Sequence, residues 1–417
     1  MNCNKKYIIN PSIKTDQDDT HLTIILPYEK KKIRFSHPFN KVLDLIAKPI
    51  ELNQLIDYGI SNEIFNFLHD ENILIPIENS KLYEYGLLKQ PENIIGKKLA
   101  LSSLKQDMNF EGQCCFIGVP VSFEHKGILS PISGTSQIRS NIKIFDLPSG
   151  SDADIPDEEY IYDTNRNQFY KRKDVLPFDL GDICYDARME TMYDVNQKIN
   201  FTVNKIVEHG LKPIALGGDH TITYSIVSSL MEYHDSITII HFDAHTDRYE
   251  GRYKNKDGLT IGNVFSEIMK NKKFHKLYQV GIREFETKSN SLQVQEDSCH
   301  IHTAHEIHSL EDVTSIFSTL DKNDPIYISF DIDVLDPVYA PEVAWPVIGG
   351  LNFHQVFTLI TYLSQHFNVI GADFVEVCAG EKKFNLAALS AAKLATLIAL
   401  NQKRKITNRG EECAINE

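Results

Sequence analysis

Hydrophobic and polar positions follow one pattern up to about residue 105 and a different pattern after it. In the first part, two β-rich runs within residues 21–36 precede apolar residues at helical spacing over residues 42–68. Ser61 stands where the last of these helices would be capped, and Gly59 marks the turn before it. We therefore predict a small α+β module over residues 1–105.

From Gln113 onward, apolar strands alternate with stretches of helical spacing. The predicted strands lie in CCFIGVP, PFDLGD, KPIALGG, SITIIHF, KLYQVGIR, PIYISFD and NVIGADFVEV, and the predicted helices include VNQKINFTVNKIVEHG and ITYSIVSSLMEYH. This alternation predicts a mainly parallel α/β sheet with helices on both faces. We expect a catalytic domain over residues 106–405, interrupted by a polar surface insertion at 150–175, and a disordered tail over 406–417.

Polar residues that a core does not need stand at the ends of four predicted strands. They are Asp219 and His220 after one strand, Asp243 to Asp247 after the next, Asp331 and Asp333 after a third, and Glu376 after the last. Ligands of open α/β sheets bind outside the carboxyl ends of the strands, so these ends should meet in one crevice. A lone Asp-x-Asp usually caps a loop, but three clusters with same-face spacing predict a shared site.

Four carboxylates in one crevice would repel one another and would take up protons unless cations were bound between them. Two divalent ions would neutralise four such charges. The candidate ligands are His220, Asp243, His245, Asp247, Asp331 and Asp333. Carboxylate oxygens with two imidazoles suit Mn²⁺, with Fe, Co, Ni or Zn as alternatives. We expect Asp219 and Asp336 to form turns or to support the ligands.

The charge balance changes the choice of partner. Lys and Arg number 43 and Asp and Glu number 57, so the formal net charge is −14, which disfavours nucleic acid or an anionic membrane and suits a cationic substrate. The chain contains neither an apolar run long enough to span a membrane nor a secretory pattern, so we expect a cytoplasmic protein. Its seven cysteines lack CxxC spacing, which indicates neither a disulfide framework nor a thiolate zinc site.

The segments LGGDHTIT, IIHFDAHTD, YISFDIDVLDP and GADFVEV together resemble the ureohydrolases, the arginase and agmatinase family of binuclear manganese enzymes. The resemblance covers the chain from about Phe116 to about Leu400. It implies a three-layer α/β/α fold, a homo-oligomer and two Mn²⁺ per subunit. The implied ligands are His220, Asp243, Asp247 and Asp331 for one ion, and Asp243, His245, Asp331 and Asp333 for the other.

The same resemblance implies the reaction. A hydroxide held between the metal ions would attack the guanidinium carbon, and urea and an amine would be released. Asp247 would pass a proton to the leaving nitrogen, and Glu376 would pair with the guanidinium, as any fixed anion could. For Glu376 the alternative is a buried acid at a strand end. Glu286 falls where arginases place an acid that contacts the substrate's amino group, with a surface role as the alternative.

Two positions depart from the family. Arginases and agmatinases usually carry a His-Gly pair after DAHxD, where the histidine moves protons, but this chain has Ile261-Gly262. Activity is then lost, or the subfamily does without the histidine, or another residue replaces it. His125 is the candidate replacement, although a solvated loop histidine is the more common outcome for such a residue. Trp345 replaces part of a Gly-Thr-Pro turn; we expect core packing for it, with a place in the substrate channel as the alternative.

The N-terminal module is a third departure, because ordinary arginases and agmatinases lack it. Its pattern is loosely similar to the winged-helix-like elements with which peptide-modifying enzymes hold a precursor peptide, and oligomerisation or a lid are the alternatives. The preferred substrate is therefore peptidyl arginine, converted to ornithine. Agmatine, guanidinobutyrate, guanidine and free arginine are alternative substrates. A catalytically silent relative that binds metal and a guanidino ligand is a further alternative.

Overall fold

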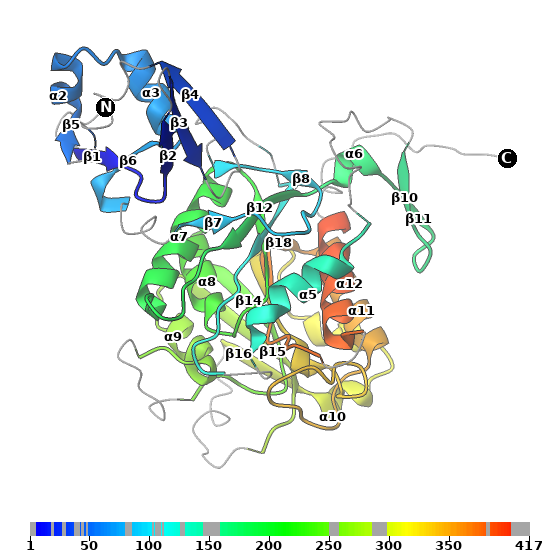
Figure 1. Cartoon of the computed structure of the whole chain (residues 1–417). Helices are drawn as coiled ribbons and strands as arrows, with labels where there is room; N and C mark the ends of the chain where they lie inside the picture. The colour runs from blue at the N-terminus through cyan, green and yellow to red at the C-terminus, as the bar shows by residue number, and fades with distance from the viewer. Residues whose placement is uncertain are drawn as a thin grey trace. The chain divides into compact units, whose positions relative to one another are not determined.

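The computed structural model in Figure 1 describes residues 6–17, 21–26, 31–36, 42, 46, 49–79, 86–101, 104, 110, 112–125, 130–144, 159–249, 258–285, 298–380 and 384–401. The chain divides into two units. The first comprises Met1–Glu92, Leu99–Met108 and Leu180–Lys198, and the second comprises Asn93–Lys98, Asn109–Asp179 and Ile199–Glu417. The domain boundaries predicted from the sequence stay a prediction, and the predicted tail lies outside the described residues.

The described part of the first unit includes two small antiparallel sheets and two short helices. One sheet has the order β2 (Lys14–Gln17), β3 (His21–Leu26), β4 (Lys31–Ser36), and the other has β1 (Lys6–Ile9) between β5 (Ile50–Glu51) and β6 (Leu74–Pro76). The helices are α2 (Leu52–Asp57) and α3 (Asn62–Asp70). Ser61 caps α3, since its Oγ accepts a hydrogen bond from Ile64 N at 3.2 Å. Leu22, Ile24, Leu55 and Leu68 share one buried core.

Seven parallel strands carry the described part of the second unit. Their order in the sheet is β16 (Cys299–Thr303), β15 (Phe274–Ile282), β14 (Ile237–Phe242), β17 (Pro325–Asp331), β18 (Asn368–Val375), β13 (Lys212–Leu216), β9 (Cys114–Gly118). Every side chain of β14 is buried, as a parallel sheet covered on both faces requires. Short strands extend the pairing: β8 (Lys97–Lys98) pairs with the start of β12 (Phe178–Ile183), and β7 (Leu88–Lys89) pairs with its end.

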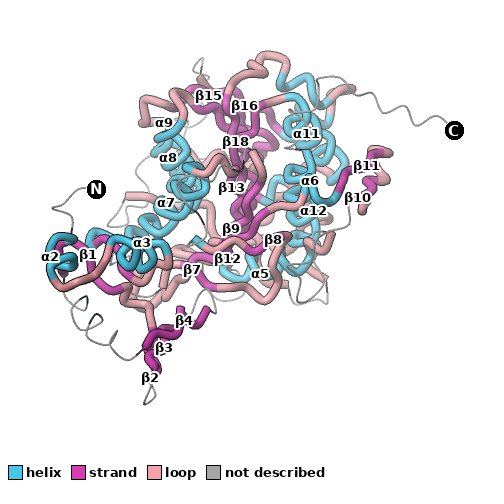
Figure 2. Tube along the Cα trace, turned by 90° about the horizontal axis from the view of Figure 1, so that it is seen from above, coloured by secondary structure: helices cyan, strands magenta, loops and turns pink. Residues whose placement is uncertain are grey.

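Helices cover both faces of this sheet (Figure 2). One face carries α7 (Met192–Glu208), α8 (Ile222–Tyr233) and α9 (Val264–Met269), and the other carries α5 (Gly134–Asn141), α11 (Phe353–His366) and α12 (Leu386–Asn401). The predicted three-layer α/β/α arrangement is therefore confirmed. None of the helices that the structure describes is both long enough and apolar enough to cross a membrane.

Shorter elements complete the described structure. They are a hairpin of β10 (Tyr160–Asp163) and β11 (Gln168–Lys171), the helices α6 (Arg172–Val175) and α10 (Ala304–His308), and the 3₁₀ turns η2 (Ile77–Asn79), η5 (Pro131–Ser133), η6 (Ile261–Asn263), η7 (Val313–Phe317) and η8 (Ile332–Val334). The hairpin and α6 occupy the described part of the predicted insertion.

The order of the strands decides where the site lies. The four strands whose ends carry the polar clusters, β14, β17, β18 and β13, are consecutive neighbours in the sheet. Their polar ends therefore point into one region, and the loops after the flanking strands β9 and β15 border it.

An ion pair in the interior of the second unit provides a stability test. Arg139 Nη1 lies 2.5 Å from Asp179 Oδ2, and both side chains are 1% exposed. The same carboxylate oxygen accepts a hydrogen bond from Ile95 N at 2.7 Å. Removing the guanidinium would therefore leave a buried carboxylate without its cation.

We expect Arg139→Met to lower the free energy of unfolding by about 3–5 kcal/mol, because the buried carboxylate of Asp179 loses the guanidinium that faces it. Urea denaturation followed by circular dichroism measures this loss. Arg139→Met combined with Asp179→Asn removes the charge and keeps an acceptor for Ile95 N, so this double variant should recover part of it. If the free energy of unfolding of Arg139→Met lay within about 1 kcal/mol of the wild-type value, the pair would not be what holds the unit together.

Candidate metal centre and substrate cavity

The predicted ligands converge on His220, which follows β13. Its Nδ1 lies 2.9 Å from Asp247 Oδ2, 3.3 Å from Asp243 Oδ2 and 3.4 Å from Asp331 Oδ2. This nitrogen is buried and has no hydrogen-bond partner among the described residues. One imidazole nitrogen surrounded by three carboxylate oxygens is an arrangement that calls for a cation between them.

A second group of donors gathers around His245. Its Nδ1 lies 3.0 Å from Asp333 Oδ2 and 3.2 Å from Asp243 Oδ1. Asp243 therefore turns one carboxylate oxygen toward each histidine, and it is the residue that joins the two groups. Asp331 is held between them through its Oδ1, which accepts a hydrogen bond from Asp333 N at 2.8 Å. All six predicted ligands thus lie in one cluster, although their assignment to individual ions stays a prediction.

A chain of hydrogen bonds fixes the orientation of the His220 ring. Ser329 Oγ donates to Asp373 Oδ1 at 2.9 Å and lies 3.0 Å from His220 Nε2. Because the serine proton is committed to Asp373, the hydroxyl accepts a hydrogen bond from Nε2. The Nδ1 lone pair then faces three carboxylates, which is favourable only when a metal ion or a proton lies between them. The donor set therefore fits a divalent ion.

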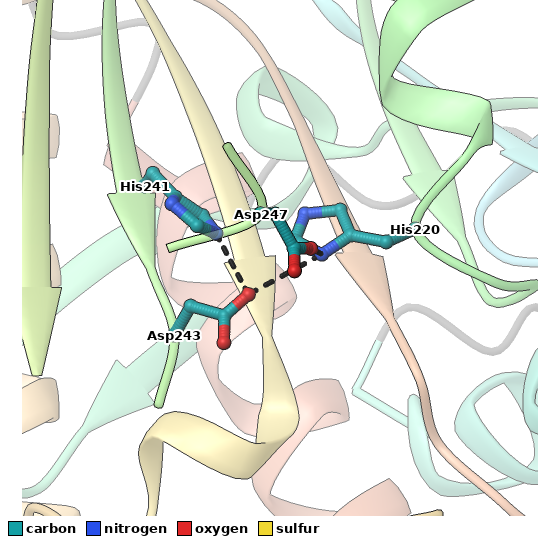
Figure 3. A group of neighbouring side chains, drawn as sticks. All are labelled: His220, His241, Asp243 and Asp247. Atoms are coloured by element: carbon teal, nitrogen blue, oxygen red, sulfur yellow. Dashed lines mark hydrogen bonds and ion pairs between the residues drawn. The ribbon is translucent and has the colours of Figure 1, made fainter. Parts of the chain in front are cut away.

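His241, inside β14, also belongs to this cluster, and sequence reasoning missed it. Its Nε2 lies 2.8 Å from Asp243 Oδ2, a contact drawn as a dashed line in Figure 3. Gln279 Nε2 lies 3.0 Å from its Nδ1. An amide NH₂ only donates, so Nδ1 accepts and Nε2–H donates to Asp243. Burial lowers the pKa of His241 to about 4, which keeps the ring neutral. The available signal was its position two residues before Asp243, on the same face of the strand.

The pKa shifts of the clustered carboxylates also indicate that the site needs cations. Burial and the neighbouring carboxylates Asp333 and Asp243 raise the pKa of Asp331 well above its ordinary value. Burial and Asp243 raise the pKa of Asp247 to about 6. Asp243 behaves in the opposite way, because the adjacent imidazoles, His241 first, outweigh burial and hold its pKa well below the ordinary value. Metal ions at this cluster would displace protons from it.

Two residues of the site have strained backbones. Asp247 has φ +48° and Glu376 has φ +62°, values in the left-handed region that side chains rarely adopt. The loop just before His220 needs glycine for another reason, since a Cβ at Gly218 would lie 2.2 Å from Val119 O. Strain of about 1–3 kcal/mol per residue is typical of positions that the surrounding structure holds in place for chemistry.

Glu376 lies on the wall of a cavity of about 590 Å³ that the metal cluster also lines. Its Oε1 accepts a hydrogen bond from His220 N at 2.8 Å. Its Oε2 is buried and has no hydrogen-bond partner among the described residues; the Nε2 of His125 lies 3.5 Å away. Burial and the charge of Asp219 raise the pKa of Glu376 well above its ordinary value, so a cation bound here would take the place of a proton.

The structure corrects two of the alternatives weighed above. Trp345 is 62% exposed and lines the cavity, so the expectation of core packing is wrong. His125 is 7% exposed in its side chain, so it is not a solvated loop histidine. Ile261 also lines the cavity and places an apolar side chain there. Glu286 lies outside the described residues, but Glu284 lines the cavity, with Oε2 3.6 Å from His245 Nε2.

The acids outside the cluster form turns, as expected. Asp219 accepts hydrogen bonds from Phe123 N at 2.6 Å and from Thr221 N at 3.2 Å. Asp336 Oδ2 accepts from Gly349 N at 2.8 Å and from Gly350 N at 3.1 Å. Both carboxylates therefore fix loops that border the cavity.

Comparisons with known proteins agree with this geometry. The model of the arginase family matches residues 113–400. An agmatinase from Salmonella paratyphi B is 30% identical over 230 residues, which are 54% of this chain and 71% of that protein. Among solved structures, a hypothetical agmatinase from Burkholderia thailandensis is 26% identical with a TM-score of 0.56, over 72% of this chain and 89% of that chain.

The proclavaminate amidino hydrolase from Streptomyces clavuligerus has a TM-score of 0.60 over 76% of this chain and 98% of that chain. At 20% identity it shows the fold alone. The family match and the clustered His and Asp donors imply a binuclear manganese site. With more than half of its length matched by the family model, the chain belongs to the arginase family and is a ureohydrolase of the arginase and agmatinase type.

Proposed function

We propose that this chain hydrolyses the guanidinium group of a small linear guanidino compound to urea and an amine, with agmatine as the first candidate. The observation that carries this proposal is the buried Oε2 of Glu376, which has no hydrogen-bond partner in the described residues and lies beside the metal donors. Glu124 and Glu284 also line the cavity and suit the cationic tail of agmatine. The agmatinase relatives support the same choice.

Two Mn²⁺ ions per subunit, with Fe, Co, Ni or Zn as alternatives, would supply a water molecule ionised near neutral pH and would stabilise negative charge. Side chains of this chain bind the substrate and move the proton. Glu376 accepts N–H groups of the guanidinium and fixes its plane against the donor cluster. A C–O bond forms at the guanidinium carbon, and the bond from that carbon to the nitrogen that carries the alkyl chain breaks. Asp247, on the cavity side of the cluster, passes a proton from the attacking oxygen to the leaving nitrogen.

Peptidyl arginine, giving ornithine, is the second candidate. Two aromatic side chains at the cavity favour a substrate that extends beyond it, since Phe285 is 97% exposed and Trp345 is 62% exposed. The first unit supplies a further argument, because the order β2-β3-β4 leaves β2 and β4 as edge strands. An edge strand can bind an extended peptide through backbone hydrogen bonds. Capture of a precursor peptide by this unit, assembly as a homo-oligomer and a cytoplasmic location are parts of this proposal.

A substrate panel separates these candidates. The Mn²⁺-loaded full-length chain is incubated with agmatine, 4-guanidinobutyrate, guanidine, free arginine and an arginine-containing peptide, and urea and product masses are measured. We expect urea from agmatine. Hydrolysis of the peptide alone would replace the first candidate by the second. Silence across the panel, with metal bound, would overturn both and indicate the catalytically silent relative.

Glu376→Gln tests whether the carboxylate of Glu376 binds the guanidinium of the substrate. Glutamine keeps an oxygen for His220 N but removes the charge, so we expect kcat/KM to fall by at least about 30-fold, as loss of one partner of a buried charged pair predicts. Steady-state kinetics with the panel substrate and metal analysis of the purified variant measure this. The matched control is Glu284→Gln, at the cavity mouth, which should lose less. Equal losses in the two variants would contradict the assigned role of Glu376.

Asp243→Asn tests the junction of the two donor groups. Because Asp243 faces both His220 and His245, we expect metal bound per chain to fall from about two ions to one or fewer and turnover to be lost. Elemental analysis after dialysis measures the metal content. The control is Asp336→Asn, which changes an acid that only holds a turn and should keep both ions. Full occupancy and activity in Asp243→Asn would refute the bridging assignment.

A further inference from the structure

The position that supplies a proton-carrying histidine in related enzymes is apolar here. Ile261 begins η6 and lines the cavity, and Tyr249 packs close by, since a Cβ at Gly262 would lie 3.3 Å from its ring. The reaction nevertheless moves two protons. Water supplies both of them to the leaving nitrogen, because a guanidinium and water become urea and an alkylammonium ion. Asp247 accounts for one proton in the proposed mechanism, and the other needs a second carrier.

His125 is placed to be that carrier. Its side chain is 7% exposed, and its Nε2 is buried without a hydrogen-bond partner in the described part of the chain. That nitrogen lies 3.5 Å from Glu376 Oε2, the oxygen at which the proposed function places the guanidinium. The imidazole lines the same cavity as Asp247, and its centroid is 6.1 Å from that of Trp345. A buried polar nitrogen aimed at the substrate position needs an explanation.

The loop that carries His125 is fixed to the metal site. Ser122 Oγ donates a hydrogen bond to the His125 carbonyl oxygen at 2.9 Å, and Phe123 N donates to Asp219 Oδ2 at 2.6 Å. Asp219 N in turn donates to Val121 O at 3.1 Å. Asp219 directly precedes the candidate ligand His220 in the chain. The position of the imidazole is therefore determined by the same loop that positions the cluster.

We propose that His125 replaces the histidine absent at position 261 and delivers the second proton to the departing amine. The neutral ring takes a proton through Nε2 from the water consumed in the reaction. After the C–N bond breaks, it returns that proton to the amine, which leaves as an alkylammonium ion. This inference rests on the proposed function, since it takes the guanidinium to be bound at Glu376. Burial lowers the pKa of His125, which agrees with a neutral acceptor in the resting site.

The first test removes the imidazole. With agmatine, or with the arginine peptide if only that is hydrolysed, we expect His125→Ala to lower kcat by about 100-fold or more while KM changes by less than about threefold. Added imidazole should restore part of kcat, because it can enter the space that alanine leaves. A residue that only positions Glu376 would raise KM and show no rescue. Unchanged kcat in His125→Ala would overturn the proposal.

The second test introduces a histidine at position 261 in the variant that lacks His125. We expect His125→Ala combined with Ile261→His to recover kcat, because the second substitution places an imidazole on the same cavity. Ile261→Val in the His125→Ala background is the matched control and should recover nothing. Recovery in the valine variant as well would show that the loss in His125→Ala comes from altered packing and would refute proton transfer. Metal content and circular dichroism check that the variants are loaded and folded.

A binding measurement separates failure of this inference from failure of the proposed function. Trp345 is the only tryptophan of the chain and lines the cavity, so its fluorescence in a stopped-flow mixing experiment reports binding of guanidinium chloride before any turnover. We expect His125→Ala to keep the wild-type dissociation constant within about threefold and Glu376→Gln to weaken binding by at least about 30-fold. Loss of binding in His125→Ala would make His125 a binding residue and refute its role as a carrier. Equal binding in Glu376→Gln would refute the guanidinium site itself.

Discussion

Four carboxylates meet at the ends of adjacent strands, and the need to neutralise their charge governs the rest of the second unit. Asp243, Asp247, Asp331 and Asp333 are buried together, where unpaired negative charges are too costly to persist. Protons or metal ions must therefore share the site, and the surrounding residues determine which of them suits it. Hydrogen bonds from Ser329 to Asp373 and from His241 to Asp243 orient the donors so that lone pairs converge on common points.

The sheet both brings these charges together and supplies the stability that holds them there. Strands β14, β17, β18 and β13 are neighbours, so the carboxyl ends of four segments far apart in sequence lie side by side. Side chains behind these ends are apolar and buried, including Phe242, Phe330 and Phe374, whose rings pack against one another. The rigid core thus supplies the stability, while the loops beyond the strand ends carry the chemistry.

The strand positions were predictable from the sequence because they depend on local spacing, and so was the clustering of the candidate donors, because they follow neighbouring strands. PIYISFD predicts β17 residue by residue. The strand-like alternation expected for DAHTD is absent, since β14 ends at Phe242 and Asp247 has a left-handed backbone. The role of His241 was not predictable, because it depends on Gln279 of the neighbouring strand. The burial of His125 was equally hidden, since the loop contacts that place it beside Glu376 join residues about 100 and 250 positions apart.

The left-handed backbones of Asp247 and Glu376 set stability against function at two defined positions. Glycine would adopt either conformation without strain, but it would also remove the carboxylate. Selection for a more stable chain and selection for a working site therefore favour different residues there. Persistence of an acid at both positions is the signature by which a relative that still performs hydrolysis can be distinguished from one that keeps only the fold.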